Sequence, residues 1–201
     1  MSERPYHHGD LTQALISHGL DAARTGGPAA ISVRELAKAA GVSATAPYRH
    51  FDSLEHLVAA VAQQARELLA TRMLTAMDAV DLADPRERAW TRLSACGRAY
   101  VEFALAEPGW FATAFHSCQV APTRPDSPDP WTLLSQTLDE LDQLGEVHPA
   151  LADSATTIAW AAVHGLSGIL AGTQPGSLEA EAALRDVLTG VQRALRAERR
   201  D

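Results

Sequence analysis

The chain has 201 residues, of which 46% are hydrophobic and 5% aromatic, and a formal net charge of −8. It shows no apolar run long enough to cross a membrane, no signal peptide, and only two cysteines, Cys96 and Cys118, without metal-ligand spacing. These features exclude a membrane-spanning or disulfide-stapled protein. We expect a cytoplasmic all-α protein without a metal or a cofactor.

The N-terminal part of the sequence predicts one helix followed by a helix-turn-helix. The first helix is expected from Asp10 to about Arg24, where Gly26-Gly27-Pro28 ends it. A second apolar periodicity follows, in the residues Val33, Leu36, Ala37 and Ala40.

Turn residues define the ends of the two short helices. Ser32 and Glu35 have the spacing of a capping box, and Gly41 follows the last apolar residue, where a left-handed conformation commonly ends a helix. Ser43 is expected to cap a further short helix over about 44–51. Such a pair of helices places one helix in the major groove of DNA, although an ordinary helical hairpin gives the same pattern.

Polar side chains on the second short helix favour DNA over a simple hairpin. Thr45, Tyr48, Arg49 and His50 suit phosphate oxygens and base edges. Phe51 then provides an apolar anchor before the next helix. We divide the chain into a DNA-binding domain over 1–56 and a second helical domain over 57–201.

The second domain reads as a series of helices without strands or repeats. The expected helices run from Ser53 to about Met77, from Pro85 to about Ala106, from Trp110 to about Cys118, from Trp131 to Leu144, from Pro149 to about Ala171, and from Leu178 to about Glu198. The proline-rich stretch 120–130 predicts an exposed loop.

Charge is spread unevenly between the two domains. Residues 1–56 hold five Lys and Arg against six Asp and Glu, which gives −1, and residues 57–201 hold 12 against 19, which gives −7. Because the first domain is not a basic patch, we expect modest DNA affinity with a shallow salt dependence.

Three motifs in order resemble the TetR family of transcriptional regulators. They are Gly41-Val42-Ser43 with Tyr48-Arg49-His50-Phe51, the opening Tyr6-His7-His8-Gly9-Asp10-Leu11, and Trp160-x-x-x-His164-Gly165. The resemblance implies an all-helical homodimer with an N-terminal three-helix DNA-binding domain and a C-terminal ligand-binding and dimerisation domain. It also implies repression at a palindromic operator, relieved by a small molecule.

Eight residues are candidates for the DNA interface, and the resemblance assigns roles to four of them by motif position, with Arg49 nearby. Ala44 and Thr45 are expected to face bases, and Tyr48 and His50 to contact phosphates. The full set is Ser32, Arg34, Ser43, Ala44, Thr45, Tyr48, Arg49 and His50. The chain departs from the family at Ala44 and Leu54, where cations are common. Pro47 is also unusual, because its missing N–H disfavours a helix interior.

Aromatic residues gather in the middle of the sequence and indicate a small-molecule pocket, with a packed core as the alternative. The candidate ligand-binding residues are Cys96, Tyr100, Phe103, Trp110, Phe111, Phe115, His116, Trp131, Trp160 and His164.

The last two helices carry apolar stripes that predict a four-helix dimer interface, and packing within one chain is the alternative. The stripes are Ala159, Ala162, Val163, Leu166, Ile169 and Leu170, and then Ala183, Leu184, Val187, Leu188 and Val191.

We expect a ligand-controlled regulator rather than an enzyme. The sequence has no His-Glu-x-x-His motif, no Gly-rich phosphate loop and no local Cys–His pair. A helix-turn-helix protein that has no effector and is controlled by a protein partner is the alternative.

Overall fold

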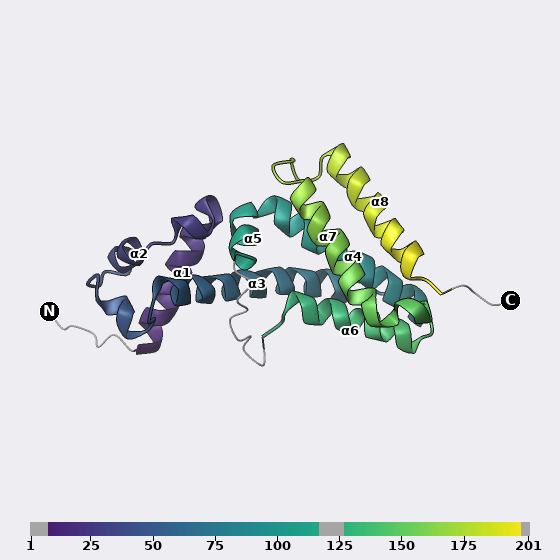
Figure 1. Ribbon diagram of the computed structural model, residues 1–201, viewed down its shortest axis with the longest axis horizontal. Helices are drawn as coiled ribbons and strands as arrows, with labels where there is room; N and C mark the ends of the chain where they lie inside the picture. The colour runs from purple at the N-terminus through teal and green to yellow at the C-terminus, as the bar shows by residue number, and fades with distance from the viewer. Residues whose placement is uncertain (1–7, 117–126, 198–201) are drawn as a thin grey trace. The chain divides into compact units, whose positions relative to one another are not determined.

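The computed structural model describes residues 8–116 and 127–197 (Figure 1). In this part of the chain every regular element is a helix, apart from one isolated bridge between Val147 and Arg196, which confirms the all-α class. Cys118, Tyr6, His7 and most of the expected loop over 120–130 lie outside the described residues. No helix in the described part is both long and apolar enough to span a membrane.

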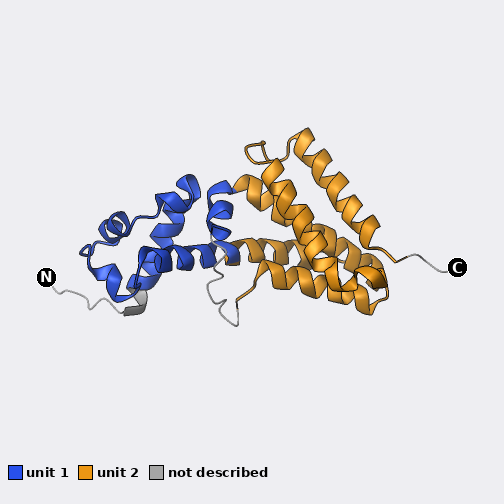
Figure 2. Cartoon of the chain, viewed as in Figure 1, with its two compact units in different colours: residues 1–66, 107–125 blue, residues 67–106, 126–201 orange. Residues whose placement is uncertain are grey.

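The chain divides into two compact units, shown in different colours in Figure 2. Unit 1 comprises residues 1–66 and 107–125, and unit 2 comprises 67–106 and 126–201. The predicted boundary at residue 56 separates two functional domains, whereas these units are defined by contacts between residues. The predicted boundary therefore stays a prediction.

Unit 1 is built on the helix α1, which packs against α2, α5 and the short 3-10 helices. Its elements are α1 (His8–Gly26), η1 (Pro28–Ala30), α2 (Val33–Ala39), η2 (Ala46–Arg49), the first part of α3 (Leu54–Asp78), and α5 (Pro108–Ala114). Buried aliphatic side chains from α1, α2, α3 and the link between η1 and α2 form its core, namely Leu11, Leu15, Ala23, Ile31, Leu36, Leu57 and Val61.

Unit 2 centres on α4, which packs against α6, α7 and α8. Its elements are the end of α3, α4 (Pro85–Ala106), α6 (Pro130–Gln143), η3 (Pro149–Ser154), α7 (Ala155–Ile169) and α8 (Leu178–Leu195). Figure 1 shows α7 and α8 running beside α4. The carboxylate of Asp84 caps α4 by accepting from the backbone N–H groups of Arg86 and Glu87 at 2.9 Å.

Two predicted features of the helix-turn-helix differ in the structure. The capping box is absent, since Ser32 makes no side-chain cap hydrogen bond at the start of α2. The second short helix is a 3-10 helix of four residues, and Ser43 accepts from Ala46 through its backbone carbonyl instead of its hydroxyl. Pro47 lies near the start of this helix and lacks an N–H, which favours a short 3-10 turn over an α-helix.

The prediction of a single helix over 149–171 is also wrong, because this segment forms the 3-10 helix η3 followed by the α-helix α7. His148 accepts a hydrogen bond from the Ala150 N–H at 3.2 Å, and Ser154 donates to the Leu151 carbonyl at 3.2 Å. These local side-chain bonds compete with α-helical ones at the start of the segment.

Five residues of the predicted dimer stripes are buried within the chain, so packing within one chain accounts for them. They are Ala159, Val163, Leu166, Leu170 and Leu184. Ile169, by contrast, has 81% of its surface exposed.

Candidate DNA-binding surface and ligand cavity

The turn between α2 and η2 has the geometry that the sequence predicts. Gly41 has a φ of +70°, and the N–H of Val42 donates to the Ala37 carbonyl at 2.9 Å. This left-handed C-cap ends α2 and reverses the chain. Val42 and Phe51 are partly buried against the core of unit 1, which fixes η2 beside α2.

The residues assigned to the DNA interface lie on the outside of this motif. Arg34, Ser43, Ala44, Thr45, Tyr48 and Arg49 are exposed, and Ser32 and His50 are half-buried. Tyr48 is a large aromatic residue, and 56% of its surface is exposed. Pro47 is the buried residue of η2, so the side of η2 that carries Pro47 faces the core. The motif therefore has an exposed, largely polar face made of Ser43, Thr45, Tyr48 and Arg49, with Ala44 among them.

His50 is held in place by α1. Its Nδ1 atom lies 3.1 Å from the Thr12 hydroxyl, and the two hydrogen-bond. On the far side of the turn, the hydroxyls of Ser43 and Thr45 are 3.2 Å apart and hydrogen-bond to each other. Side chains fixed in this way lose less rotamer entropy when they bind a phosphate or a base.

Acidic groups lie close to this face. A hydrogen bond with the Ser53 hydroxyl lowers the pKa of the exposed Glu55 carboxyl from its ordinary value. Asp52 lies 3.4 Å from the His56 imidazole. Leu54, where a cation is common in the family, is 39% exposed and adds no positive charge.

Within unit 1, α5 packs closely against the end of α1. The indole N–H of Trp110 donates to the Leu20 carbonyl at 2.8 Å, and Arg24 makes a two-point salt bridge with Glu107 at 2.6 and 2.8 Å. The Arg24 guanidinium also lies 4.9 Å from the centroid of the Trp110 ring. Gly109 is buried against the backbone of α1, where a Cβ atom would lie 2.2 Å from the Ala23 carbonyl oxygen.

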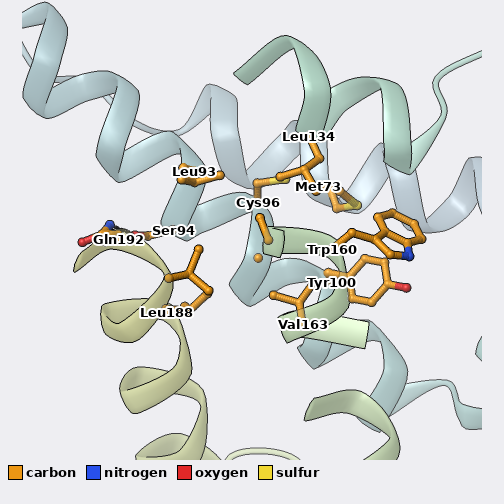
Figure 3. A pocket seen from close by; sticks show the side chains of 13 residues that line it. Met73, Leu93, Ser94, Cys96, Tyr100, Leu134, Trp160, Val163, Leu188 and Gln192 are labelled. Carbon is orange, nitrogen blue, oxygen red and sulfur yellow. Dashed lines mark hydrogen bonds between the residues drawn. The ribbon is translucent and has the colours of Figure 1, made fainter. Parts of the chain in front are cut away.

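An apolar cavity lies in unit 2, among the end of α3, α4, α6, α7 and α8 (Figure 3). The space left free inside it is about 20 Å³, roughly that of one water molecule, so the lining side chains nearly fill the cavity. It is lined by Met73, Leu93, Ser94, Cys96, Gly97, Tyr100, Leu134, Ala159, Trp160, Val163, Leu188, Val191 and Gln192. No charged side chain is among these lining residues.

The two ends of the cavity differ in chemistry. In Figure 3, Ser94 and Gln192 lie at one end and Tyr100 and Trp160 at the other. The Tyr100 hydroxyl hydrogen-bonds to Nδ1 of His164 at 2.7 Å, and burial raises the Tyr100 pKa. Burial also raises the pKa of the Cys96 thiol to about 12, so this thiol is neutral and unreactive at physiological pH.

The predicted ligand-binding residues fall into three groups. Cys96, Tyr100 and Trp160 line the cavity. Trp131, His164 and Phe103 form the second group, which belongs to unit 2 but does not line the cavity. The rings of Trp131 and His164 contact the ring of Trp160, and Phe103 is buried.

The other four predicted residues, Trp110, Phe111, Phe115 and His116, belong to unit 1. Phe111 and Phe115 pack edge to face there, with ring centroids 5.0 Å apart. A role for any of the ten residues in ligand binding stays a prediction.

Sequence reasoning missed the aliphatic and polar walls of the cavity. Gly97 carried a usable signal, because a glycine inside a long helix often marks a close helix contact. A Cβ atom at Gly97 would lie 2.7 Å from Leu188 and 3.3 Å from Val163, so the glycine lets α7 and α8 approach α4.

The fold and the exposed motif define a helix-turn-helix DNA-binding regulator of transcription. Residues 15–61 match the family of bacterial regulatory proteins named tetR, and residues 93–197 match the tetracyclin repressor-like C-terminal domain. The second match spans more than half of the chain, and the chain belongs to the TetR family. Membership implies DNA binding and dimerisation.

Solved structures share this fold over nearly the whole chain. A protein of unknown function from Rhodococcus sp. RHA1 is 26% identical with a TM-score of 0.75, covering 96% of this chain and 99% of that one. A TetR family regulator from Marinobacter aquaeolei VT8 is 19% identical with a TM-score of 0.63, covering 94% and 96%. RolR, in complex with its ligand resorcinol, is 17% identical with a TM-score of 0.67, covering 94% and 89%. No curated protein matches the sequence.

Proposed function

We propose that the protein is a homodimeric repressor that binds a palindromic operator and is released by a small molecule. The observation that carries this proposal is the exposed polar face of the helix-turn-helix, with the consecutive residues 43–45 and 48–49 all accessible. The role requires no catalysis. It implies action in the cytoplasm, where the DNA lies.

The proposed DNA contacts follow from this exposed face. In this proposal Ala44 and Thr45 meet base edges, and Tyr48, Arg49 and His50 meet phosphates. Arg34, with Ser32 and Ser43, lies at the edge of the same face. Few of these side chains are cations, so two half-sites must bind together for useful affinity.

Dimerisation through α7 and α8 is supported by their exposed apolar residues. Ile169 near the end of α7 is 81% exposed, and Leu178 at the start of α8 is 92% exposed. Ala161 and Gly165 are exposed on α7, and a Cβ atom at Gly165 would meet nothing within 4 Å. Small residues beside large apolar ones permit close packing of a second copy of the two helices.

Effector control is supported by the cavity in unit 2 and by a structural neighbour. The cavity is apolar with polar groups at its ends, as ligand sites usually are, and its free space of about 20 Å³ must widen to admit a ligand. RolR shares the fold and is described with resorcinol bound. A ligand that fits the cavity better in one conformation of the dimer shifts the population away from DNA binding.

A two-stage experiment tests this function. An operator is first selected from random duplex DNA with the purified protein, and metabolites are then screened by thermal shift and by release of that operator. We expect some compound both to raise the melting temperature and to release the DNA. If compounds never affect either signal while DNA binding is intact, control by a protein partner replaces control by an effector.

The DNA contacts are tested with the double variant Tyr48→Phe, His50→Ala. It is expected to bind the selected operator at least about tenfold more weakly at equal salt, since two phosphate contacts of roughly 1 kcal/mol each are lost. Equal affinity of the variant and the parent contradicts the contact assignment.

A further inference from the structure

A groove on the surface of unit 2 lies between α4 and α8. It is open to solvent and holds about 370 Å³ of free space, whereas the inner cavity holds about 20 Å³. The groove therefore has room for a small organic molecule without any change in the packing of the helices. Its lining consists of Thr91, Ser94, Ala95 and Arg98 of α4 and of Arg185, Leu188, Thr189 and Gln192 of α8.

The floor of the groove is closed. Ser94, Leu188 and Gln192 line both the groove and the inner cavity, so these side chains separate the two spaces. The amide nitrogen of Gln192 donates to the Ser94 hydroxyl and to the Trp90 carbonyl, the latter at 3.3 Å. Figure 3 shows Gln192 of α8 beside Ser94 of α4. A ligand bound in the groove therefore stays outside the core.

Arg98, at one end of the groove, keeps one edge of its guanidinium free. Its Nη1 lies 2.9 Å from a Glu181 oxygen and 3.4 Å from a Glu102 oxygen, while its Nε and Nη2 have no hydrogen bond among the described residues. Arg24 uses the same two atoms, Nε and Nη2, to hold the Glu107 carboxylate at 2.8 and 2.6 Å. The free edge of Arg98 therefore matches a carboxylate, and the two glutamates hold the guanidinium in place before a ligand arrives.

A second cation, Arg185, lines the groove one helical turn after Glu181 on α8. Its side chain is 67% exposed, and its Nε lies 3.7 Å from Asp186. Because Glu181, Glu102 and Asp186 offset part of the positive charge of the two arginines, the site favours a single negative charge over the double charge of a phosphate monoester.

The rest of the groove combines apolar and hydroxyl groups. Ala95 and Leu188 provide an apolar surface next to the arginines. Thr91 lies seven residues from Arg98 on α4, which corresponds to about 10 Å along the helix, and Thr189 adds a hydroxyl from α8. This lining suits a molecule with a carboxylate at one end, an apolar middle and a hydroxyl or carbonyl group at the other end.

We propose that the groove binds a small monocarboxylate of this kind. Its carboxylate binds the Nε–Nη2 edge of Arg98 with Arg185 beside it, its apolar middle lies on Ala95 and Leu188, and its polar end hydrogen-bonds to Thr91. The proposal goes beyond the proposed function, because the site binds its ligand whether or not that ligand releases an operator.

Three matched compounds test the site. The probe is para-hydroxyphenylacetate, which has a carboxylate, an aromatic ring and a hydroxyl; para-hydroxyphenylacetamide lacks the charge, and phenylacetate lacks the hydroxyl. Their dissociation constants are measured by isothermal titration calorimetry with the full chain and with the variants Arg98→Lys, Arg185→Gln and Thr91→Val. The control is Arg193→Lys, at an exposed arginine of α8 that lines neither space.

We expect the parent to bind para-hydroxyphenylacetate at least about tenfold more tightly than its amide, since hydrogen bonds to a charged group are lost in the amide. Arg98→Lys keeps the charge but lacks the two-point edge, and it should weaken both carboxylates by about three- to tenfold. Arg185→Gln should weaken them by about two- to threefold, the range of an exposed ion pair. Thr91→Val should remove the preference for para-hydroxyphenylacetate over phenylacetate.

The control Arg193→Lys should change none of these constants. The proposal is overturned if the parent does not bind para-hydroxyphenylacetate at millimolar concentrations, or if the acid and its amide bind equally well. It is also overturned if Arg98→Lys and Arg185→Gln bind the carboxylates as tightly as the control does.

Discussion

Gly109 is the residue at which a single methyl group should do the most damage in unit 1. In Gly109→Ala the new Cβ atom would lie 2.2 and 2.3 Å from the carbonyl oxygens of Ala23 and Arg24, whereas ordinary contact begins at 3.4 Å. These are backbone atoms of α1, so they cannot rotate away. To relieve the overlap, α5 must move from α1 by more than 1 Å.

The expected loss of stability follows from that displacement. Overpacking at a rigid contact costs about 1–3 kcal/mol, and loss of the hydrogen bond from Trp110 to the Leu20 carbonyl adds about 1 kcal/mol. A total of about 2–4 kcal/mol corresponds to a fall of roughly 5–15 °C in melting temperature for a chain of this length.

The assay is thermal unfolding followed by circular dichroism, with Gly190→Ala as the control. A Cβ atom at Gly190 in α8 meets nothing within 4 Å, so alanine there should stabilise the helix by up to about 1 kcal/mol. The packing of α5 on α1 is refuted if Gly109→Ala raises the melting temperature as the control does.

Three further predictions concern other parts of the molecule. Ile169→Glu should convert the dimer to a monomer, as measured by sedimentation velocity. The control Leu82→Glu changes a partly exposed residue outside α7 and α8 and should leave the dimer intact. If both variants remain dimers, the proposed interface is contradicted. Burial raises the Cys96 pKa from 9.0 to about 12, so the thiol of the unfolded chain loses its proton at lower pH than the thiol of the folded chain. The free energy of unfolding should therefore fall above about pH 9, and it should fall less steeply in Cys96→Ala. Equal slopes against pH for the two proteins in denaturant titrations would argue against a buried thiol. Thr12→Val removes the hydroxyl that holds His50, and operator affinity measured by fluorescence anisotropy should drop about fivefold; an unchanged affinity would show that His50 needs no such support.

Long apolar periodicities allowed most helices to be predicted from sequence. The helix predicted from Ser53 to about Met77 is observed over Leu54–Asp78, and the one predicted from Pro85 to about Ala106 is observed over the same residues. Asp84 and Ser53 cap these helices, and such side chains are readable directly from the sequence.

Short elements were less predictable, because one hydrogen bond decides them. Pro47 removes a donor within the second helix of the motif and leaves only a 3-10 turn. His148 and Ser154 divert backbone bonds at the start of the segment predicted as one helix. Periodicity carries no information about such local competition.

The composition of the cavity could be predicted only in part. Aromatic residues close in sequence belong to different units, since Trp110 packs on α1 whereas Tyr100 and Trp160 line the cavity. Leu188 and Gln192 reach the cavity from the last helix, and only the three-dimensional packing of α8 on α4 brings them there.

The central claim is sequence-specific DNA binding by a dimer, and one titration tests it most directly. A fluorescent duplex obtained by selection is titrated with the protein at several salt concentrations, with anisotropy as the signal. We predict two-fold symmetric half-sites about one helical turn apart, two chains per duplex, and a shallow slope of log affinity against log salt. Failure of selection to enrich any sequence, with no binding even at low salt, would contradict the claim.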